Sequence, residues 1–326
     1  MIVLGIESSC DDTSIAILNN NTLLSHICSS QNNNSFGGVF PEYAAREHLS
    51  SIDPTMRMSL QQAKCKLSDI ECIGVTNRPG LLGSLVVGVS YAKALSLAHN
   101  IPIIGIHHLE AHLVVPQYTH NIQFPYGVIL LSGGHSMIIL AHSLGQYEIL
   151  GTTKDDAVGE LFDKVARCIG LKQPGGPEIE KCALQGNTTI DLPVPLRGDM
   201  SYDLSFSGLK TAAQRKWNDG DKSDIYRSNL CFSLQNTIYE TLKERMMNVW
   251  MKYCTENWVL VGGVAANKYL RNRLRELCDE NKRKLIVPPA NLCTDNGVMV
   301  AYAALLRAED KLYDDLSLRP YARAKL

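Results

Sequence analysis

Three histidines and a glutamate fall within one short stretch, "GIHHLEAHLV" (105–114), directly after an apolar run. The spacing predicts a short helix over 107–115 that ends ahead of Pro116. In that helix His108 and His112 occupy positions i and i+4, so they share one face. Imidazole nitrogens bind zinc and iron well, and two of them leave room for a third protein ligand and an open position. The pair therefore indicates a site for one divalent cation.

The third ligand must come from elsewhere in the chain. Asp295, in the turn "CTDNG" ahead of the last predicted helix, is the candidate. His107 points away from the pair, so we expect it to support the site from behind or to lie at the surface. An isolated histidine pair is often only the polar edge of a helix, and that alternative stays open. A zinc peptidase is disfavoured, because its glutamate directly follows the first histidine, whereas Glu110 comes two residues after His108.

Glycine pairs occur in three turns, "LLSGGHS", "VLVGGVAANKYL" and "QPGGP". At such turns a ligand can approach the backbone closely, and the backbone N–H groups can face an anion. None has the spacing of a Walker or dinucleotide motif, so they indicate nucleotide binding without naming the nucleotide. The residues that this interpretation singles out are Ser132, Gly133 and Gly134 in the first turn and Asn267, a candidate helix cap, after the second.

Acidic residues gather in two places. Asp11 and Asp12 lie in the first turn of the chain, in "SSCDDT". Asp155 and Asp156 open a predicted helix over 155–170, where we expect them to offset the helix dipole. Asp163 differs, because it lies one turn beyond Gly159 and next to Phe162 in an otherwise apolar stripe, from where it could reach a ribose hydroxyl.

The order of the predicted elements indicates a duplication. Apolar runs at 2–8, at 14–18 and from Thr22 predict a three-stranded meander, and a related pattern returns over 126–142 and beyond. Strands and helices alternate after each copy. We therefore expect a two-lobe α/β fold in which turns at the carboxyl ends of strands line a central nucleotide cleft. Lobe I is predicted over 1–118 with the C-terminal segment 295–326 packed back on it, and lobe II over 119–294.

Composition excludes several classes of protein. The 326 residues include 45% hydrophobic and 20% charged side chains, which is typical of a globular protein with ample material for a core. The 10 cysteines are scattered singly, which disfavours a cysteine zinc cluster and fits reduced thiols in a cytosolic protein. No targeting peptide or apolar run long enough to cross a bilayer is expected. With a net charge of −1, any nucleic acid must bind to a local patch.

The motifs taken together resemble a known family. In chain order they are "GIESSCDDT", "GGVFPEYAAREH", "HHLEAH", "LLSGGHS", "DDAVGELFDKVAR", "PGGP", "SFSGLKTA", "GGVAANKYLR" and "CTDNGVMVA". They occur in this order in the universal tRNA threonylcarbamoyl transferases. The resemblance implies a duplicated fold of the actin, Hsp70 and sugar-kinase (ASKHA) type. It also implies transfer of a threonylcarbamoyl group from threonylcarbamoyl-AMP to N6 of adenosine 37 in tRNAs that read codons beginning with A.

The same resemblance implies ligands and partners. It assigns His108, His112 and Asp295 to one metal ion, Fe(2+) in preference to Zn(2+). It assigns threonylcarbamoyl-AMP, with ATP or AMP as alternative occupants of the same cleft, to eight residues. Five were singled out above, and the resemblance adds Leu130, Leu131 and Gly176. The full set is Leu130, Leu131, Ser132, Gly133, Gly134, Asp163, Gly176 and Asn267. The implied partners are tRNA, a heterodimer partner of related fold (TsaB type) and an ATPase subunit (TsaE type), with no membrane.

Two positions depart from the family pattern. Asp12 stands where many members have glutamate, and Arg78 stands where glycine is common, which puts a cation near the mouth of the cleft. Neither change removes a ligand. In the expected acyl transfer Asp11 or Asp12 orients or deprotonates the attacking amine, and no covalent nucleophile is required.

For tRNA, the best basic patch lies around a predicted helix and comprises Lys268, Arg271, Arg273, Arg275, Lys282, Arg283 and Lys284. Acidic residues interleave with it, so a solvated helix face is the competing interpretation. Two rival functions remain at this point. A small-molecule kinase of the same fold would lack the paired histidines, and a non-catalytic scaffold subunit would tolerate loss of the metal ligands.

Overall fold

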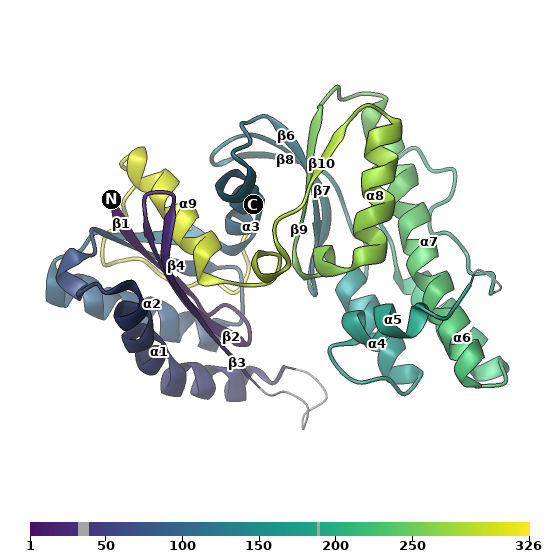
Figure 1. The fold of residues 1–326 in the computed structure, drawn as a ribbon, viewed down its shortest axis with the longest axis horizontal. Coiled ribbons are helices and arrows are strands. Elements are labelled where there is room, and N and C mark those ends of the chain that lie inside the picture. The colour runs from purple at the N-terminus through teal and green to yellow at the C-terminus, as the bar shows by residue number, and fades with distance from the viewer. Residues whose placement is uncertain (32–38, 188–189) are drawn as a thin grey trace. The chain divides into compact units, whose positions relative to one another are not determined.

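The computed structural model describes residues 1–31, 39–187 and 190–326, which divide into two compact units (Figure 1). Unit 1 comprises Met1–Ile122 and Thr294–Leu326, and unit 2 comprises Gln123–Cys293. We propose that these units are the two lobes expected from the sequence.

Unit 1 is built on a five-stranded sheet. Its order is β3 (Thr22–Ser30), β2 (Asp12–Asn19), β1 (Ile2–Glu7), β4 (Cys72–Arg78) and β5 (Ile103–His107). The first three strands form an antiparallel meander, whereas β4 lies parallel to β1 and β5 parallel to β4. Such a parallel extension requires crossover connections, and helices provide them.

Helices cover both faces of this sheet. Helices α1 (Pro41–Ala63) and α2 (Leu82–His99) bury Ile52 and Val89 in one cluster with Leu4 and Ile6 of β1. Residue 5 faces the opposite way, because side chains alternate along a strand, and α9 (Gly297–Glu309) packs directly on its backbone. Helix α3 (His108–His120) packs against α9.

Unit 2 repeats the sheet of unit 1. Its order is β8 (Gln146–Thr152), β7 (Ser136–Ser143), β6 (Tyr126–Leu131), β9 (Asn257–Val261) and β10 (Lys284–Ile286). Strands β6, β7 and β8 form the antiparallel meander, and β9 and β10 extend it in parallel. The duplicated α/β fold expected from the sequence is confirmed.

Five α-helices lie within the described part of unit 2: α4 (Val158–Cys168), α5 (Gly175–Ala183), α6 (Ser207–Asp219), α7 (Asp224–Trp250) and α8 (Lys268–Glu280). The apolar stripe of α4, with Leu161, Phe162 and Val165, is buried in the main hydrophobic core of the unit. Helix α7 is buried along most of its length.

Three expectations about helices need correction. Helix α3 runs through Pro116 to His120, although its predicted end was ahead of the proline. Every residue from Leu109 to Pro116 is buried, so packing outweighs the lost backbone hydrogen bond. Helix α4 begins at Val158, not at residue 155. Helix α2, 18 residues long, is apolar enough to cross a membrane by length and composition, and it packs against β4 and α1 with part of its surface.

Candidate functional site

Three potential metal ligands converge in unit 1. Both histidines lie in the first turns of α3, and Asp295 lies just ahead of α9. Nε2 of His112 is 3.1 Å and Nε2 of His108 is 3.4 Å from the same oxygen, Oδ1 of Asp295. One ligand atom from each residue lies within 4.8 Å of the other two. Metal–ligand bonds of about 2.0–2.2 Å place neighbouring ligand atoms about 3.0–3.6 Å apart, so the donors and their spacing fit a divalent ion.

A buried carboxylate orients His108 from behind. Glu7, the last residue of β1, is fully buried, and its Oε2 lies 3.2 Å from Nδ1 of His108. The hydroxyl of Ser9 lies 3.1 Å from the same nitrogen. Glu7 is itself fixed, because Ser9 N donates to its Oε1 at 2.6 Å and Thr76 Oγ1 donates to its Oε2 at 2.6 Å. A carboxylate on Nδ1 fixes the ring and leaves Nε2 to face a metal.

The charges of this cluster are mutually dependent. Burial alone would lower the pKa of His108, but the carboxylates of Asp295 and Glu7 outweigh burial and raise that pKa to about 9. Burial would raise the pKa of Glu7, but His108 lowers it below its ordinary value. The carboxylates of Glu7 and Asp295 therefore favour a positive charge on or beside the imidazole of His108.

An ion pair ties together the two helices that carry the ligands. Arg307 of α9 donates from Nε to Oε1 of Glu110 at 2.6 Å and from Nη2 to Oε2 at 2.9 Å. Glu110 is buried at 2% exposure, on α3 between the two histidines. This pairing contradicts the peptidase alternative, because the carboxylate is bound to an arginine.

The acidic turn belongs to the same unit. Burial raises the pKa of Asp12 to about 6, with further contributions from the carboxylates of Asp11 and Asp295. The turn is held by the buried His48 of α1, whose Nε2 lies 3.0 Å from the carbonyl of Cys10 and whose Nδ1 lies 2.7 Å from Oγ1 of Thr13. A general-base role for Asp11 or Asp12 stays a prediction.

His107 is not a surface residue. It is 4% exposed and caps α3, accepting at Nδ1 from the backbone N of Leu109 at 3.2 Å. Burial, with the charges of Arg78 and His108, lowers its pKa to about 4. The surface alternative is therefore wrong, whereas support of α3 from behind is what the cap provides.

In unit 2 the first glycine turn exposes its backbone. Leu130 and Leu131 end β6 and are fully buried. The backbone N of Ser132 donates to the carbonyl of His135 at 2.8 Å and closes the turn. Around Gly133 and Gly134 a Cβ would meet nothing within 4 Å. This turn therefore has room for a ligand directly beside its N–H groups.

Two further glycines bring neighbouring elements against this turn. The backbone N of Gly159 in α4 donates to the carbonyl of Ser132 at 3.2 Å. A Cβ at Gly159 would lie 2.7 Å from Cα of Gly133, so only glycine allows this approach. Gly262, with φ +89, packs against the carbonyl of Leu131. The start of α4 and two of the three predicted glycine turns thus meet at the end of β6.

Asp163, in α4, contacts the start of α5, where Gly176 lies. The Oδ1 of Asp163 accepts from the backbone N of Gly175 at 2.7 Å, and its carbonyl accepts from Gln173. Burial raises the pKa of the Asp163 carboxyl. A Cβ at Gly176 would touch only the Phe162 ring, at 3.8 Å. Contact of Asp163 with a ribose stays a prediction.

Asn267 caps α8, as the sequence predicted. Its Oδ1 accepts from the backbone N of Leu270 at 2.9 Å, and its Nδ2 donates to Oε1 of Gln235 at 2.7 Å. The side chain is 5% exposed. Both ends of the amide thus have internal partners, and its assignment to the adenylate stays a prediction.

The dipole interpretation of Asp155 is wrong, because α4 begins beyond it. Its Oδ1 accepts from the backbone N of Phe206 at 2.6 Å, and Oδ2 accepts from the hydroxyls of Ser205 at 2.6 Å and Ser207 at 2.8 Å. Asp156 pairs with Lys210 at 2.6 Å. Together these carboxylates fix the "SFSGLK" segment at the start of α6, a pairing across 50 residues that local spacing does not reveal.

The basic patch on and beyond α8 is partly engaged within unit 2. Arg271 donates to a backbone carbonyl at 3.0 Å, Arg273 pairs with Glu276 at 2.8 Å, and Arg283 lies over the Trp250 ring. Lys268, Arg275, Lys282 and Lys284 are exposed. A role of this patch in tRNA binding stays a prediction.

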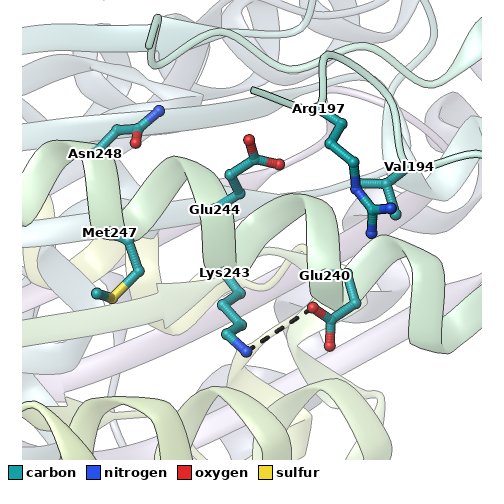
Figure 2. A pocket seen from close by; sticks show the side chains of 7 residues that line it. All are labelled: Val194, Arg197, Glu240, Lys243, Glu244, Met247 and Asn248. Carbon is teal, nitrogen blue, oxygen red and sulfur yellow. Dashed lines mark ion pairs between the residues drawn. The ribbon is translucent and has the colours of Figure 1, made fainter. Parts of the chain in front are cut away.

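A pocket on unit 2 contains none of the expected site residues. Figure 2 shows it beside α7, lined by Val194, Arg197, Glu240, Lys243, Glu244, Met247 and Asn248. Its cations and carboxylates are mixed, with Lys243 3.9 Å from Glu240. It presents no ligand set of one charge.

Solved structures with low sequence identity share the fold. Nucleotide-bound HypF covers 96% of this chain and 56% of its own, at a TM-score of 0.61 and 14% identity. Component A of (R)-2-hydroxyglutaryl-CoA dehydratase from Acidaminococcus fermentans covers 95% of this chain and 99% of its own, at a TM-score of 0.58 and 12% identity. These likenesses concern the fold alone, which is of the actin, Hsp70 and sugar-kinase type.

Sequence relatives are far closer. A protein from Rickettsia massiliae is 44% identical over 336 residues, which cover 99% of this chain and 98% of that protein. One from Bartonella henselae is 43% identical over 345 residues, covering 99% and 94%. Both are called tRNA N6-adenosine threonylcarbamoyltransferase. The TsaD family model, with the same description, matches residues 22–302. The chain therefore belongs to the TsaD family of tRNA N6-adenosine threonylcarbamoyltransferases.

Proposed function

We propose that this protein transfers the threonylcarbamoyl group from threonylcarbamoyl-AMP to N6 of adenosine 37 in tRNAs that read codons beginning with A. The observation that carries the proposal is the convergence of His108, His112 and Asp295 on one point in a member of the TsaD family. A sugar kinase of the same fold has no use for such a ligand set, since its phosphates require magnesium with oxygen ligands.

The reaction is an acyl transfer. The amine N6 attacks the carbamoyl carbon, a C–N bond forms, and the C–O bond to the phosphate breaks so that AMP leaves. Negative charge grows first on the carbonyl oxygen and then on the phosphate. The backbone N–H groups of Gly133 and Gly134, in the turn that Ser132 closes, stabilise that charge by donating hydrogen bonds. Asp11 or Asp12 accepts the proton that the amine loses.

His108, His112 and Asp295 hold one divalent ion, Fe(2+) in preference to Zn(2+). When bound, the ion would supply Lewis-acid stabilisation of negative charge. Glu7 orients His108 through Nδ1, and the pair of Glu110 with Arg307 fixes α3 against α9. Leu130, Leu131, Asp163, Gly176 and Asn267 complete the site for threonylcarbamoyl-AMP, which ATP or AMP can also occupy.

The proposed setting is the cytoplasm, with tRNA as substrate and two protein partners: a TsaB-type heterodimer partner of related fold and a TsaE-type ATPase. An exposed apolar face of helix α2 supports the proposal of a heterodimer partner. Its Leu82, Val86 and Leu97 are 53%, 44% and 73% exposed, and their spacing places them on one face of the helix. Val86→Glu is expected to abolish co-purification of the heterodimer partner while unit 1 stays folded.

Reconstitution tests the function directly. The protein and its partners are supplied with threonine, bicarbonate, ATP, an adenylate-forming enzyme and unmodified tRNA, and the digested tRNA is analysed by mass spectrometry. Threonylcarbamoyladenosine is expected only when this chain is present. Product formation without the chain, or its absence from the complete mixture, contradicts the proposal, and ADP formation dependent on a polyol would support the kinase instead.

A further inference from the structure

The C-terminal segment of unit 1 lies along its sheet as an extended strap. Asp314 forms a bridge with Ile103 of β5, and its carboxylate accepts from the backbone N of Gly105 at 2.8 Å. Leu318 is buried in the core, and Lys93 of α2 donates to its carbonyl at 3.1 Å. These interactions anchor the segment directly ahead of its cationic end.

Residues 319–325, which we call the C-terminal strap, are fixed by their backbone. Asn77 Nδ2 donates to the carbonyl of Arg319 at 3.0 Å, and the backbone N of Tyr321 donates to the carbonyl of Asn77 at 2.8 Å. The backbone N of Gly80 donates to the carbonyl of Ala322 at 3.2 Å. Because backbone atoms of the strap make these hydrogen bonds, its side chains are not needed to hold it in place.

The strap passes close to the metal ligands. Asn77 and Gly80, which hold the strap, flank Arg78, and Arg78 is the sheet partner of His107, which directly precedes the ligand His108. Gly80, which holds the strap, is followed by Leu81, whose backbone N donates to the carbonyl of Ser9 at 2.8 Å.

All charged side chains of the strap are cationic. Arg319, Arg323 and Lys325 are exposed, and 319–326 contains no carboxylate side chain. Within the described residues none of these three, nor the neighbouring Arg78, forms an ion pair. Exposed arginines elsewhere, such as Arg46 and Arg57, pair with a carboxylate one turn away on their helix. The chain as a whole has a net charge of −1, so this is a local excess of positive charge.

We propose that the C-terminal strap binds the tRNA backbone next to the adenosine that is modified, an inference that rests on the proposed function. Cations on a fixed backbone bind phosphates in a set register and position a nucleic acid without reading its sequence. Tyr321, 52% exposed between the cations, offers a ring on which an unpaired base stacks. A strap beside the metal ligands thus holds the RNA where the amine must react.

Salt dependence of tRNA binding tests this surface. The variant Arg323→Gln with Lys325→Gln is compared with Lys64→Gln plus Lys66→Gln, which removes two exposed cations at the end of α1. Dissociation constants for unmodified tRNA are measured from about 0.05 to 0.2 M KCl, with each variant assembled with its partners. The plot of the logarithm of the association constant against log[salt] has a negative slope. In the strap variant the magnitude of this slope is expected to decrease by about 0.7–0.9 for every phosphate that is no longer neutralised, whereas the control keeps its slope. Arg323→Lys with Lys325→Arg should also keep the original slope.

Steady-state kinetics distinguish tRNA binding by the strap from a role in binding the metal or threonylcarbamoyl-AMP. The KM for tRNA is expected to rise about tenfold in the strap variant, with metal content and the KM for threonylcarbamoyl-AMP unchanged. Equal slopes for the strap and control variants overturn the inference, and so does loss of a protein partner with an unaltered slope. Binding is measured without transfer, so failure of the unaltered protein to modify tRNA counts against the proposed function alone.

Discussion

The two units share one sheet order, yet they build their sites from different material. Strand β1 ends in the buried carboxylate of Glu7, followed by a turn rich in serine and aspartate. Its counterpart β6 ends in the apolar Leu131, followed by Ser132 and two glycines. The first turn gathers side chains that attract a cation, and we call His108, His112, Asp295 and their supporting residues the side-chain site. The second turn exposes N–H groups that attract an anion, and we call this turn at Ser132–Gly134 the backbone site. The two units have the same sheet, and the residues that follow β1 or β6 determine whether the adjacent site attracts a cation or an anion.

Removing a ligand should break the side-chain site completely. His112→Ala is expected to remove the bound metal and to lower transfer at least about 1,000-fold, because the ion and the preorganised charges are lost together. Metal content by elemental analysis and transfer by mass spectrometry measure the effect, and circular dichroism checks folding. The control is His99→Ala, an exposed histidine at the end of α2. Normal transfer by a metal-free His112→Ala protein would remove the metal from the mechanism.

Glu110→Gln should weaken the frame of the side-chain site and leave unit 2 intact. Removing one charge of a buried bidentate pair is expected to lower the free energy of unfolding by about 3 kcal/mol, since Arg307 loses its partner in a site of low exposure. Metal affinity should fall about tenfold, because Glu110 supports the helix that carries both histidines.

The matched control is Glu42→Gln, whose exposed pair with Arg46 should contribute no more than about 0.5 kcal/mol. Denaturant unfolding and metal titration measure both variants. Equal stability of the two variants would show that the α3–α9 pair does not hold the ligands in place.

Gly159→Ala should damage the backbone site alone. The new Cβ would lie 2.7 Å from Cα of Gly133, so the turn or α4 must move, at a cost of about 2 kcal/mol in the free energy of unfolding. Binding of AMP, measured by calorimetry, is expected to weaken more than tenfold while metal content is unchanged. Gly208→Ala, where nothing lies within 4 Å, is the control and should bind AMP normally. Loss of metal in Gly159→Ala would contradict the separation of the two sites.

Asp155→Asn should produce the smallest change. Although burial alone would raise the pKa of Asp155, hydrogen bonds from the 205–207 segment lower it to about 2, so its contribution to stability is present above about pH 4 and is lost as the pH falls towards 2. Because the group is largely exposed, we expect the variant to be about 1 kcal/mol less stable at pH 7.

The stability difference should shrink at pH 3, as followed by urea unfolding. Asp279→Asn on the exposed face of α8 is the control and should show no such dependence. A pH-independent difference would mean that the geometry of the segment, and not the charge of Asp155, sets its stability.

Local spacing predicted part of this molecule well. Continuous apolar runs separated by polar turns located both meanders, and the i and i+4 spacing of His108 and His112 placed their rings together. The partners that fix them lie far away in the chain. Glu7 is 101 residues from His108, and Arg307 is 197 residues from Glu110. A glutamate that ends an apolar strand was the only local sign of the first pair.

Where spacing failed, tertiary packing had overridden a local preference. Pro116 predicts the end of a helix, yet burial on all sides carries α3 past it. Asp155 and Asp156 suit a helix start, yet hydrogen bonds and an ion pair to the start of α6 recruit them first. Sites formed by the backbone are harder still to predict from sequence. The close approach of Gly159 to Gly133 depends on how α4 packs against the turn after β6, which composition does not encode.

The path of the chain has a consequence for its synthesis. The polypeptide leaves unit 1 after Ile122 and re-enters it at Thr294, so Asp295 and helix α9 emerge from the ribosome only after all of unit 2. A nascent chain carries both imidazoles long before it has their carboxylate partner, and the sheet of unit 1 lacks one covering helix until then. A product that terminates within unit 2 would have neither the complete ligand set nor the complete core of unit 1, so a bound metal shows that translation has passed Asp295.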